Sequence, residues 1–209
     1  MKFETISVGN LSTNCYIVYD EILKKGIIID PGADGNRIIA KAMELELQIE
    51  YVVFTHFHFD HILAYHKVKG AFPSAVTLIS EKEEPAMTDE TKSLLFYTED
   101  TFEKITDYNT VKEGDLITFG EASLKVIETP GHTQGCICLY GNGILFSGDT
   151  LFYGSVGRWD FPGGSLNDEL SSIREKLFIL PEDTRVYPGH GENTTIKYEK
   201  ENNLILKNM

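Results

Sequence analysis

The feature that most constrains this chain is a run of metal-ligand side chains at the end of a hydrophobic segment. Residues 51–54 are typical of a buried strand, and they lead directly into the letters THFHFDH. In an extended backbone alternate side chains point the same way, so His56 and His58 can reach one cation. Asp60 and His61 follow where the chain must turn, and that turn can direct them toward a neighbouring cation. Histidines in a core usually occur singly, so this run predicts a metal site.

Three further ligand-type side chains follow later hydrophobic segments. His132 lies in the letters TPGHT, Asp149 in SGDT and His190 in YPGHG. Each follows an apolar strand and sits in a glycine-containing turn, where strand ends can converge on a shared crevice. A site for two metal ions needs ligands from distant segments, and these three side chains supply them.

The remaining pattern predicts short strands that alternate irregularly with helices. Segments rich in β-branched and aromatic residues predict strands at 3–8, 14–19, 26–30, 115–119, 123–128, 136–140, 143–147 and 184–187. Helices are expected at 35–47, where Ile38, Ile39, Ala42 and Met43 form one apolar stripe, at 62–68, at 166–177 with Ser165 as its cap, and at 196–205. No linker, repeat or low-complexity run interrupts the chain, so we expect one domain over residues 1–209. This pattern favours a layered α/β domain with sheets packed face to face and helices outside.

The charge balance argues against nucleic acid as a partner. The formal net charge is -13, and a surface of that sign repels phosphate backbones. The acidic residues are scattered, as at Glu81, Glu83 and Glu84, and we expect them to form a solvated face. The polar stretch 81–107 is expected to form helices or a cover over the site.

Cysteine usage and the first residues point to the cytoplasm. Cys15, Cys136 and Cys138 are an odd number in expected strands, and buried free thiols suit a reducing compartment. Residues 1–11 lack the apolar core of a signal peptide. No stretch approaches the roughly 18 uninterrupted apolar residues of a membrane helix. We therefore expect a cytoplasmic protein with no membrane partner.

The segment GSVGRWDFPGG, residues 154–164, is the candidate substrate segment. Its glycines let backbone approach a site closely, Arg158 offers a planar cation and Asp160 a carboxylate. One interpretation places Arg158 near an anionic substrate group or in support of the metal ligands. The other is an internal ion pair between Arg158 and Asp160 that only shapes the loop. Tyr153 is a further candidate for the lining of the substrate cavity.

These motifs resemble the metallo-β-lactamase superfamily, and most closely its short glyoxalase-II-like branch of hydroxyacylglutathione hydrolase-like enzymes. The resemblance runs from Asp30-Pro31-Gly32 to Pro188-Gly189-His190-Gly191. It implies a four-layer αβ/βα sandwich, an α+β arrangement with the site at one edge between the sheets. It also implies two sets of metal ligands with Asp149 bridging between them: His56, His58 and His132 for the first ion, and Asp60, His61 and His190 for the second.

The resemblance implies hydrolysis of a small-molecule thioester of the hydroxyacylglutathione type. Two divalent ions, zinc as the first expectation and iron or manganese as compatible ones, lower the pKa of a shared water toward neutrality. The metal-bound hydroxide would attack the thioester carbonyl, with Asp60 and Asp149 as ligands that orient it. Full-length glyoxalase II continues with a helical domain that helps to hold glutathione, and too few residues follow His190 to form one.

Two alternatives differ in kind from a hydrolase. A mononuclear iron persulfide dioxygenase of the same superfamily would hold one iron with two histidines and an aspartate, matching His56, His132 and Asp149. Dependence on oxygen separates the two activities. A non-catalytic metal protein would close its coordination sphere with four protein ligands, usually rich in cysteine, whereas these ligands leave room for water or substrate.

Overall fold

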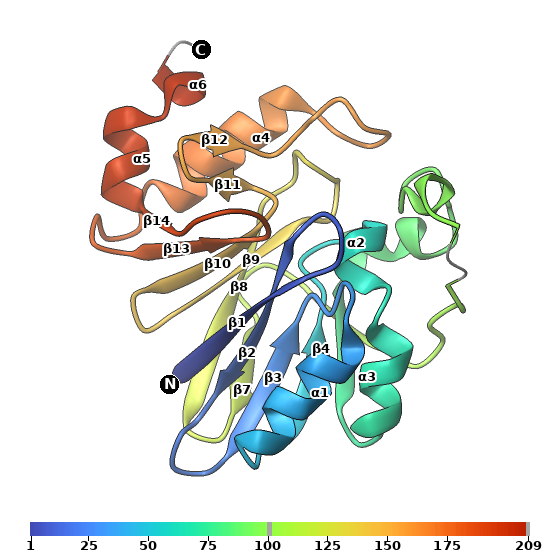
Figure 1. Cartoon of the computed structure of the whole chain (residues 1–209). Coiled ribbons are helices and arrows are strands. Elements are labelled where there is room, and N and C mark those ends of the chain that lie inside the picture. Colours follow the sequence, from blue (N-terminus) through green and yellow to red (C-terminus); the bar gives the residue numbers. More distant parts are fainter. Residues whose placement is uncertain (100–101, 208–209) are drawn as a thin grey trace.

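Two six-stranded sheets lie face to face with helices on both outer sides (Figure 1). This computed structural model describes residues 1–99 and 102–207. The first sheet has the order β1 (Lys2–Val8), β2 (Thr13–Tyr19), β3 (Lys25–Ile29), β4 (Gln48–Val53), β5 (Val76–Ser80) and β6 (Asn109–Val111). The second has the order β14 (Thr194–Thr195), β13 (Arg185–Pro188), β10 (Ile144–Gly148), β9 (Ile137–Gly141), β8 (Ala122–Glu128) and β7 (Leu116–Phe119). A small hairpin pairs β11 (Leu151–Phe152) with β12 (Ser155–Val156).

Helices cover the outer face of each sheet. On the first sheet they are α1 (Gly35–Glu44), α2 (Phe59–Ile62) and α3 (Tyr65–Ala71). On the second they are α4 (Leu166–Ser172), which continues as a π-helical turn (Ile173–Leu177), α5 (Ile196–Asn202) and α6 (Leu204–Lys207). Short 3₁₀ turns form at Glu81–Met87 and Leu95–Tyr97. Among the described residues no helix is long and apolar enough to cross a membrane.

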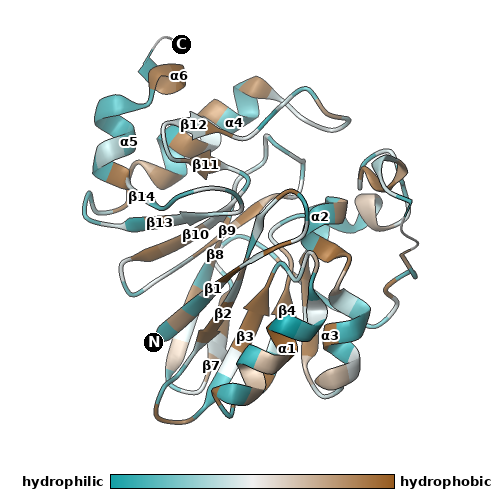
Figure 2. Ribbon diagram, viewed as in Figure 1, coloured by the Kyte–Doolittle hydropathy of each residue, from teal (hydrophilic) through white to brown (hydrophobic). Residues whose placement is uncertain are grey.

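Alternation along the central strands creates three layers of core. In β2 the side chains of Cys15 and Ile17 pack toward the helices, while Tyr16 and Val18 pack between the sheets. A strand buried on both faces is hydrophobic along its whole length, and Figure 2 shows such strands in brown at the centre of both sheets. A third cluster, which includes Leu145, lies between the second sheet and its helices. The four-layer αβ/βα sandwich predicted from the sequence is therefore confirmed.

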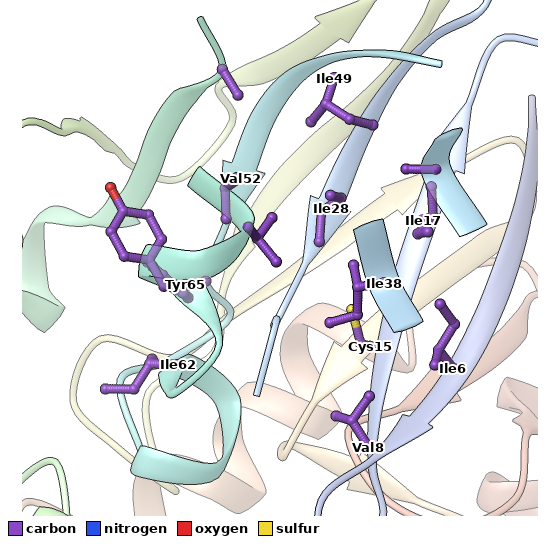
Figure 3. Packing of buried hydrophobic residues seen from close by; sticks show 14 of the residues in the cluster. Ile6, Val8, Cys15, Ile17, Ile28, Ile38, Ile49, Val52, Ile62 and Tyr65 are labelled. Carbon is purple, nitrogen blue, oxygen red and sulfur yellow. The ribbon is translucent and has the colours of Figure 1, made fainter. Parts of the chain in front are cut away.

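The helix side of the first sheet is a continuous aliphatic layer. Figure 3 shows Ile38 of α1 among Cys15, Ile17 and Ile28, with Ile62 and Tyr65 farther along the same layer. The predicted apolar stripe of α1 is only partly buried, because Met43 is 58% exposed. The helix ends at Glu44 rather than at 47, and Glu46 takes a positive φ of 57° that stops it.

Most strand predictions agree with the structure to within three residues. The predicted cap is also confirmed, since the Ser165 hydroxyl accepts a hydrogen bond from the Asp168 N–H. The helix expected at 62–68 is two helices, α2 and α3. β5, β6 and the two-residue strands β11, β12 and β14 were not predicted. All three cysteines are buried and free, as expected.

Phe146 tests the layer between the sheets. Its ring is fully buried and lies 4.9 Å from that of Tyr16 and 5.4 Å from that of Phe3, centroid to centroid. We expect Phe146→Ala to lower the free energy of unfolding by about 3–5 kcal/mol, because it removes a large side chain and leaves a cavity. Urea unfolding measures the change. Leu116→Ala, at a side chain 65% exposed, is the control and should stay within about 0.5 kcal/mol of the parent.

Candidate metal centre

Four strand ends meet at one edge of the sandwich. β4 leads to His56, while β8, β10 and β13 lead to His132, Asp149 and His190. β9 is antiparallel to both β8 and β10, and β13 is parallel to β10, so the three ligand-bearing strands of the second sheet point the same way. The N–H of Ile137 donates to the carbonyl of Thr55 at 2.9 Å, which joins this edge to the end of β4. The topology therefore brings all seven predicted ligand side chains together.

The first cluster consists of His56, His58 and His132, all buried. The Nδ1 atom of His58 lies 3.1 Å from Nε2 of His56 and 2.9 Å from Nε2 of His132. Tetrahedral zinc with bonds of about 2.0–2.1 Å would separate two such nitrogens by about 3.3 Å. Burial lowers the pKa of all three rings, that of His58 to about 3, so they are neutral and carry lone pairs. This is the donor set that a cation requires.

The second cluster consists of Asp60, His61 and His190. The Oδ2 atom of Asp60 lies 3.1 Å from Nε2 of His190 and 3.6 Å from Nε2 of His61. Burial works to lower the pKa of His61, but the carboxylates of Asp60, Asp149 and Asp30 raise it above its usual range. The negative charge of these carboxylates, which favours a proton on this ring, also favours a metal cation beside it.

Asp149 lies between the two clusters. Its Oδ2 is 3.6 Å from Nε2 of His132 and 3.5 Å from Nε2 of His190, and its Oδ1 is 3.5 Å from Nε2 of His61. Both Asp149 Oδ1 and His61 Nε2 are buried with no hydrogen-bond partner among the described residues. Buried polar atoms normally have partners, so these two unpartnered atoms, one in the second cluster and one between the clusters, fit a centre for two metal ions.

Hydrogen bonds on the far side of four rings determine which nitrogen faces the centre. We assign the proton to Nδ1 in each, because Nδ1 lies beside an oxygen that accepts it, and Nε2 is then left for a metal. The pairs are His56 with Thr55 Oγ1 at 3.1 Å, His61 with Asp30 Oδ2 at 2.9 Å, His132 with the Arg158 carbonyl at 2.7 Å, and His190 with the Leu11 carbonyl at 3.1 Å.

Two side chains that support the ligands were missed in the sequence. Asp30 directly follows β3 and accepts hydrogen bonds from the Thr55 N–H at 2.7 Å and hydroxyl at 2.6 Å as well as from His61. Thr13 at the start of β2 donates to Asp60 Oδ2 at 2.8 Å. Asp30 begins an Asp-Pro-Gly sequence, which predicts a turn at the end of a strand. That pattern does not predict a hydrogen bond to His61, which lies 31 residues later in the chain.

A cavity of about 680 Å³ opens on the centre, and we call it the site cavity. Five of the ligand side chains line it, together with apolar groups and one arginine. The apolar walls come from the loop before β2, from the start of α2, from the stretch after the first 3₁₀ turn and from the segment after β10: Leu11, Phe59, Leu94, Tyr97, Phe152 and Phe161. The ligands therefore face a volume large enough for a small molecule.

The candidate substrate residues take different positions. Arg158 lines the site cavity, and its guanidinium lies 4.1 Å from the centre of the Phe161 ring. It also makes a two-pronged ion pair with Asp160 at 2.9 and 2.8 Å, so the internal ion pair is present, and a contact of Arg158 with an anionic substrate stays a prediction. Asp160 itself is exposed and outside the described lining. Tyr153 is 51% exposed and stacks on Tyr198, outside the described lining; Phe152 is the residue that faces the cavity instead.

The stretch 81–107 lies against the site in part. Leu94 and Tyr97 line the site cavity, while residues 100 and 101 lie outside the described residues. The expectation of a solvated acidic face is wrong at Glu83, which is only 2% exposed. The sixth histidine, His66, is outside the clusters and hydrogen-bonded to the carbonyl of Glu103.

The chain belongs to the metallo-beta-lactamase superfamily, whose family model matches residues 8–190. A relative from Haemophilus influenzae, the hydroxyacylglutathione hydrolase GloC, is 33% identical over 99% of this chain and 98% of its own length. The family binds metal ions, and the centre described above fits two of them.

Solved structures share the whole fold. The BLEG-1 B3 metallo-beta-lactamase is 36% identical with a TM-score of 0.89, over 98% of this chain and 99% of its own. TTHA1623 in a di-iron-bound form is 30% identical with a TM-score of 0.86, over 97% and 100%. ETHE1 from Myxococcus xanthus is 28% identical with a TM-score of 0.83, over 100% and 85%. The chain is thus a metallo-hydrolase of this superfamily, and one of these neighbours holds two irons.

His58→Ala tests the first cluster. We expect the variant to bind less metal, because it lacks the ring nitrogen that lies close to both His56 and His132. Removing a residue that only hydrogen-bonds to a metal ligand costs roughly 10–100-fold in activity, and removing His58 itself should cost more. Elemental analysis of the purified protein gives the metal content. His66→Ala is the matched control and should keep the parent metal content; equal loss in both variants would contradict the assignment.

Proposed function

We propose that the chain is a metal-dependent hydrolase that cleaves small-molecule thioesters of the hydroxyacylglutathione type. The proposal rests on two clusters of metal-ligand side chains, with Asp149 between them, that lie at the wall of an open cavity. A closed structural site would leave no position for water or substrate. The similarity to the hydroxyacylglutathione hydrolase GloC over nearly the whole chain supports the choice of thioesters.

When bound, two divalent ions supply Lewis acidity and a water of lowered pKa. His56, His58 and His132 would hold one ion and Asp60, His61 and His190 the other, with Asp149 between them. Burial works to raise the pKa of Asp149, but the neighbouring imidazoles hold it at about 2. Asp60 and Asp149 are therefore ionised; they act as ligands and hydrogen-bond acceptors that orient the attacking water, and they have no proton to donate.

The chain offers no thiol nucleophile that would compete with this route. Burial raises the pKa of Cys15, Cys136 and Cys138, that of Cys138 to about 12. A thiol in that state carries almost no thiolate at neutral pH, so a covalent acyl-cysteine step is not supported. We propose zinc as the metal; histidine-rich ligation also suits iron or manganese, and a di-iron neighbour exists.

A second candidate is a mononuclear iron persulfide dioxygenase. One observation favours it: Asp149 is the one carboxylate within reach of the first cluster among the described residues, and its Oδ2 is 3.6 Å from Nε2 of His132. Two histidines and an aspartate are the facial ligand set of non-haem iron oxygenases. His56, His132 and Asp149 would form that set.

Anaerobic thiol release from an S-acylglutathione tests the hydrolase. We expect release in proportion to bound metal, measured with a thiol reagent on samples of known metal content. His58→Ala protein provides the blank. Release that requires air, or oxygen uptake on a glutathione persulfide without any anaerobic thiol release, would replace the hydrolase with the dioxygenase.

Arg158→Ala tests the substrate wall. We expect KM to rise several-fold with kcat little changed, because Arg158 lines the site cavity, while its carbonyl, which accepts a hydrogen bond from His132, is retained in the variant. Asp160→Ala is the matched variant that frees the same guanidinium. An exposed ion pair contributes little to stability, so Asp160→Ala should keep the parent KM. An equal rise in both variants would assign the pair to the shape of the loop.

A further inference from the structure

Glu83 is a buried carboxylate in the 3₁₀ turn Glu81–Met87, directly after β5. Its Oε1 accepts a hydrogen bond from the Phe57 N–H at 3.0 Å, and its Oε2 accepts one from the Thr133 hydroxyl at 2.9 Å. The Gly135 N–H is a third donor to the same carboxylate. A Cβ on Gly135 would lie 2.4 Å from Oε2, so only glycine permits this approach.

The donors belong to the two loops that carry the first cluster. Phe57 stands between His56 and His58, and Thr133 directly follows His132. A single carboxylate therefore fixes the backbone between two ligands and the side chain next to the third. The two loops follow strands of different sheets, and the Glu83 carboxylate joins them by these hydrogen bonds.

Stability alone is a poor reason to bury this group. Removing a carboxylate from water costs several kcal/mol, and apolar replacements of buried charges are often neutral or stabilising. Glu83 has no ion-pair partner within 4 Å among the described residues, only hydrogen-bond donors. These donors all lie near metal-ligand side chains. Their placement points to the geometry of those ligands as the reason for burying Glu83.

We propose that Glu83 is a positioning residue that holds His56, His58 and His132 at the spacing at which their three nitrogens bind one ion. The proposal rests on the proposed metal chemistry of this centre and adds a residue that sets its geometry. Glu83 does not touch the ion or the substrate; it acts through Phe57, Thr133 and Gly135.

Cobalt(II) is the probe, because its visible spectrum reports coordination number and geometry independently of activity. Affinity is measured by competition with a chelator, and melting temperature is measured alongside. Glu83→Gln keeps the size of the side chain but turns one acceptor into a donor. Glu83→Asp keeps the charge and moves it back by one methylene. Thr133→Val removes one donor and leaves Glu83 unchanged.

Glu199→Gln is the matched control. Glu199 is fully buried and likewise accepts several hydrogen bonds, from the Thr194 hydroxyl at 2.6 Å, the Asn203 side chain at 2.8 Å and the Gly154 N–H at 3.1 Å. These donors lie in segments that carry none of the first cluster. The variant therefore reports the general effect of losing a buried carboxylate.

We expect Glu83→Gln and Glu83→Asp to weaken binding of the tighter cobalt ion by about 10–100-fold and to change its spectrum. Thr133→Val should change the affinity and the spectrum in the same direction but by less. If Glu83→Gln does not fold, Thr133→Val and Glu83→Asp together test the proposal. Glu199→Gln should lower the melting temperature while keeping the parent spectrum and affinity.

Two results would overturn the proposal. If folded Glu83 variants keep the parent cobalt spectrum and affinity, Glu83 serves stability only. If Glu83→Asp matches the parent while Glu83→Gln does not, charge and not position is what matters. Parent protein that binds no cobalt would instead refute the proposed function itself, and the two failures are thereby distinguishable.

Discussion

The centre depends on holding the buried imidazole nitrogens of three histidines close together around one point. Nitrogens of His56, His58 and His132 lie about as near to one another as hydrogen-bonded atoms, yet burial keeps all three rings neutral. Such an arrangement is unfavourable without a cation, so the surrounding structure must impose it. The two sheets do this by packing over a shared core, which places the ends of β4, β8, β10 and β13 at one edge.

Three buried acidic side chains also lie next to the segments that carry the ligands. Asp30 fixes Thr55 and His61, and Glu83 spans the loops of the first cluster. Glu169 of α4 lies so close to the loop before His132 that a Cβ on Gly131 would be 2.1 Å from its Oε2, and burial raises its pKa to about 9. These acids come from different elements, so the centre is braced from several sides and does not depend on any single loop.

The ligands could be predicted from the sequence because each one follows a hydrophobic strand in a local turn motif. The four-layer fold followed from the same strands and from the resemblance that the motifs carry. The buried acidic residues near the ligands could not be predicted, because their hydrogen-bond partners are distant in the sequence. Glu83 lies in a run of acidic residues that is typical of a solvated face, and only the fold places the Phe57 N–H beside it. Tyr153 and Phe152 are adjacent aromatics, and only the path of the β11–β12 hairpin decides that Phe152 faces the cavity.

The histidine motif alone does not decide between the proposed hydrolase and the proposed dioxygenase. His56, His132 and Asp149 would serve either proposed activity, and each follows the end of a sheet strand. The site cavity differs in origin, because most of its apolar wall comes from segments around Leu11, Leu94 to Tyr97 and Phe152 to Phe161, and only Phe59 of the described apolar lining belongs to the histidine motif. Loops can change without disturbing a packed core, so one metal centre can serve several substrates. Its single arginine pairs with Asp160 and lies beside an apolar wall, so the described lining offers a substrate apolar contacts and one cation next to the metal ligands.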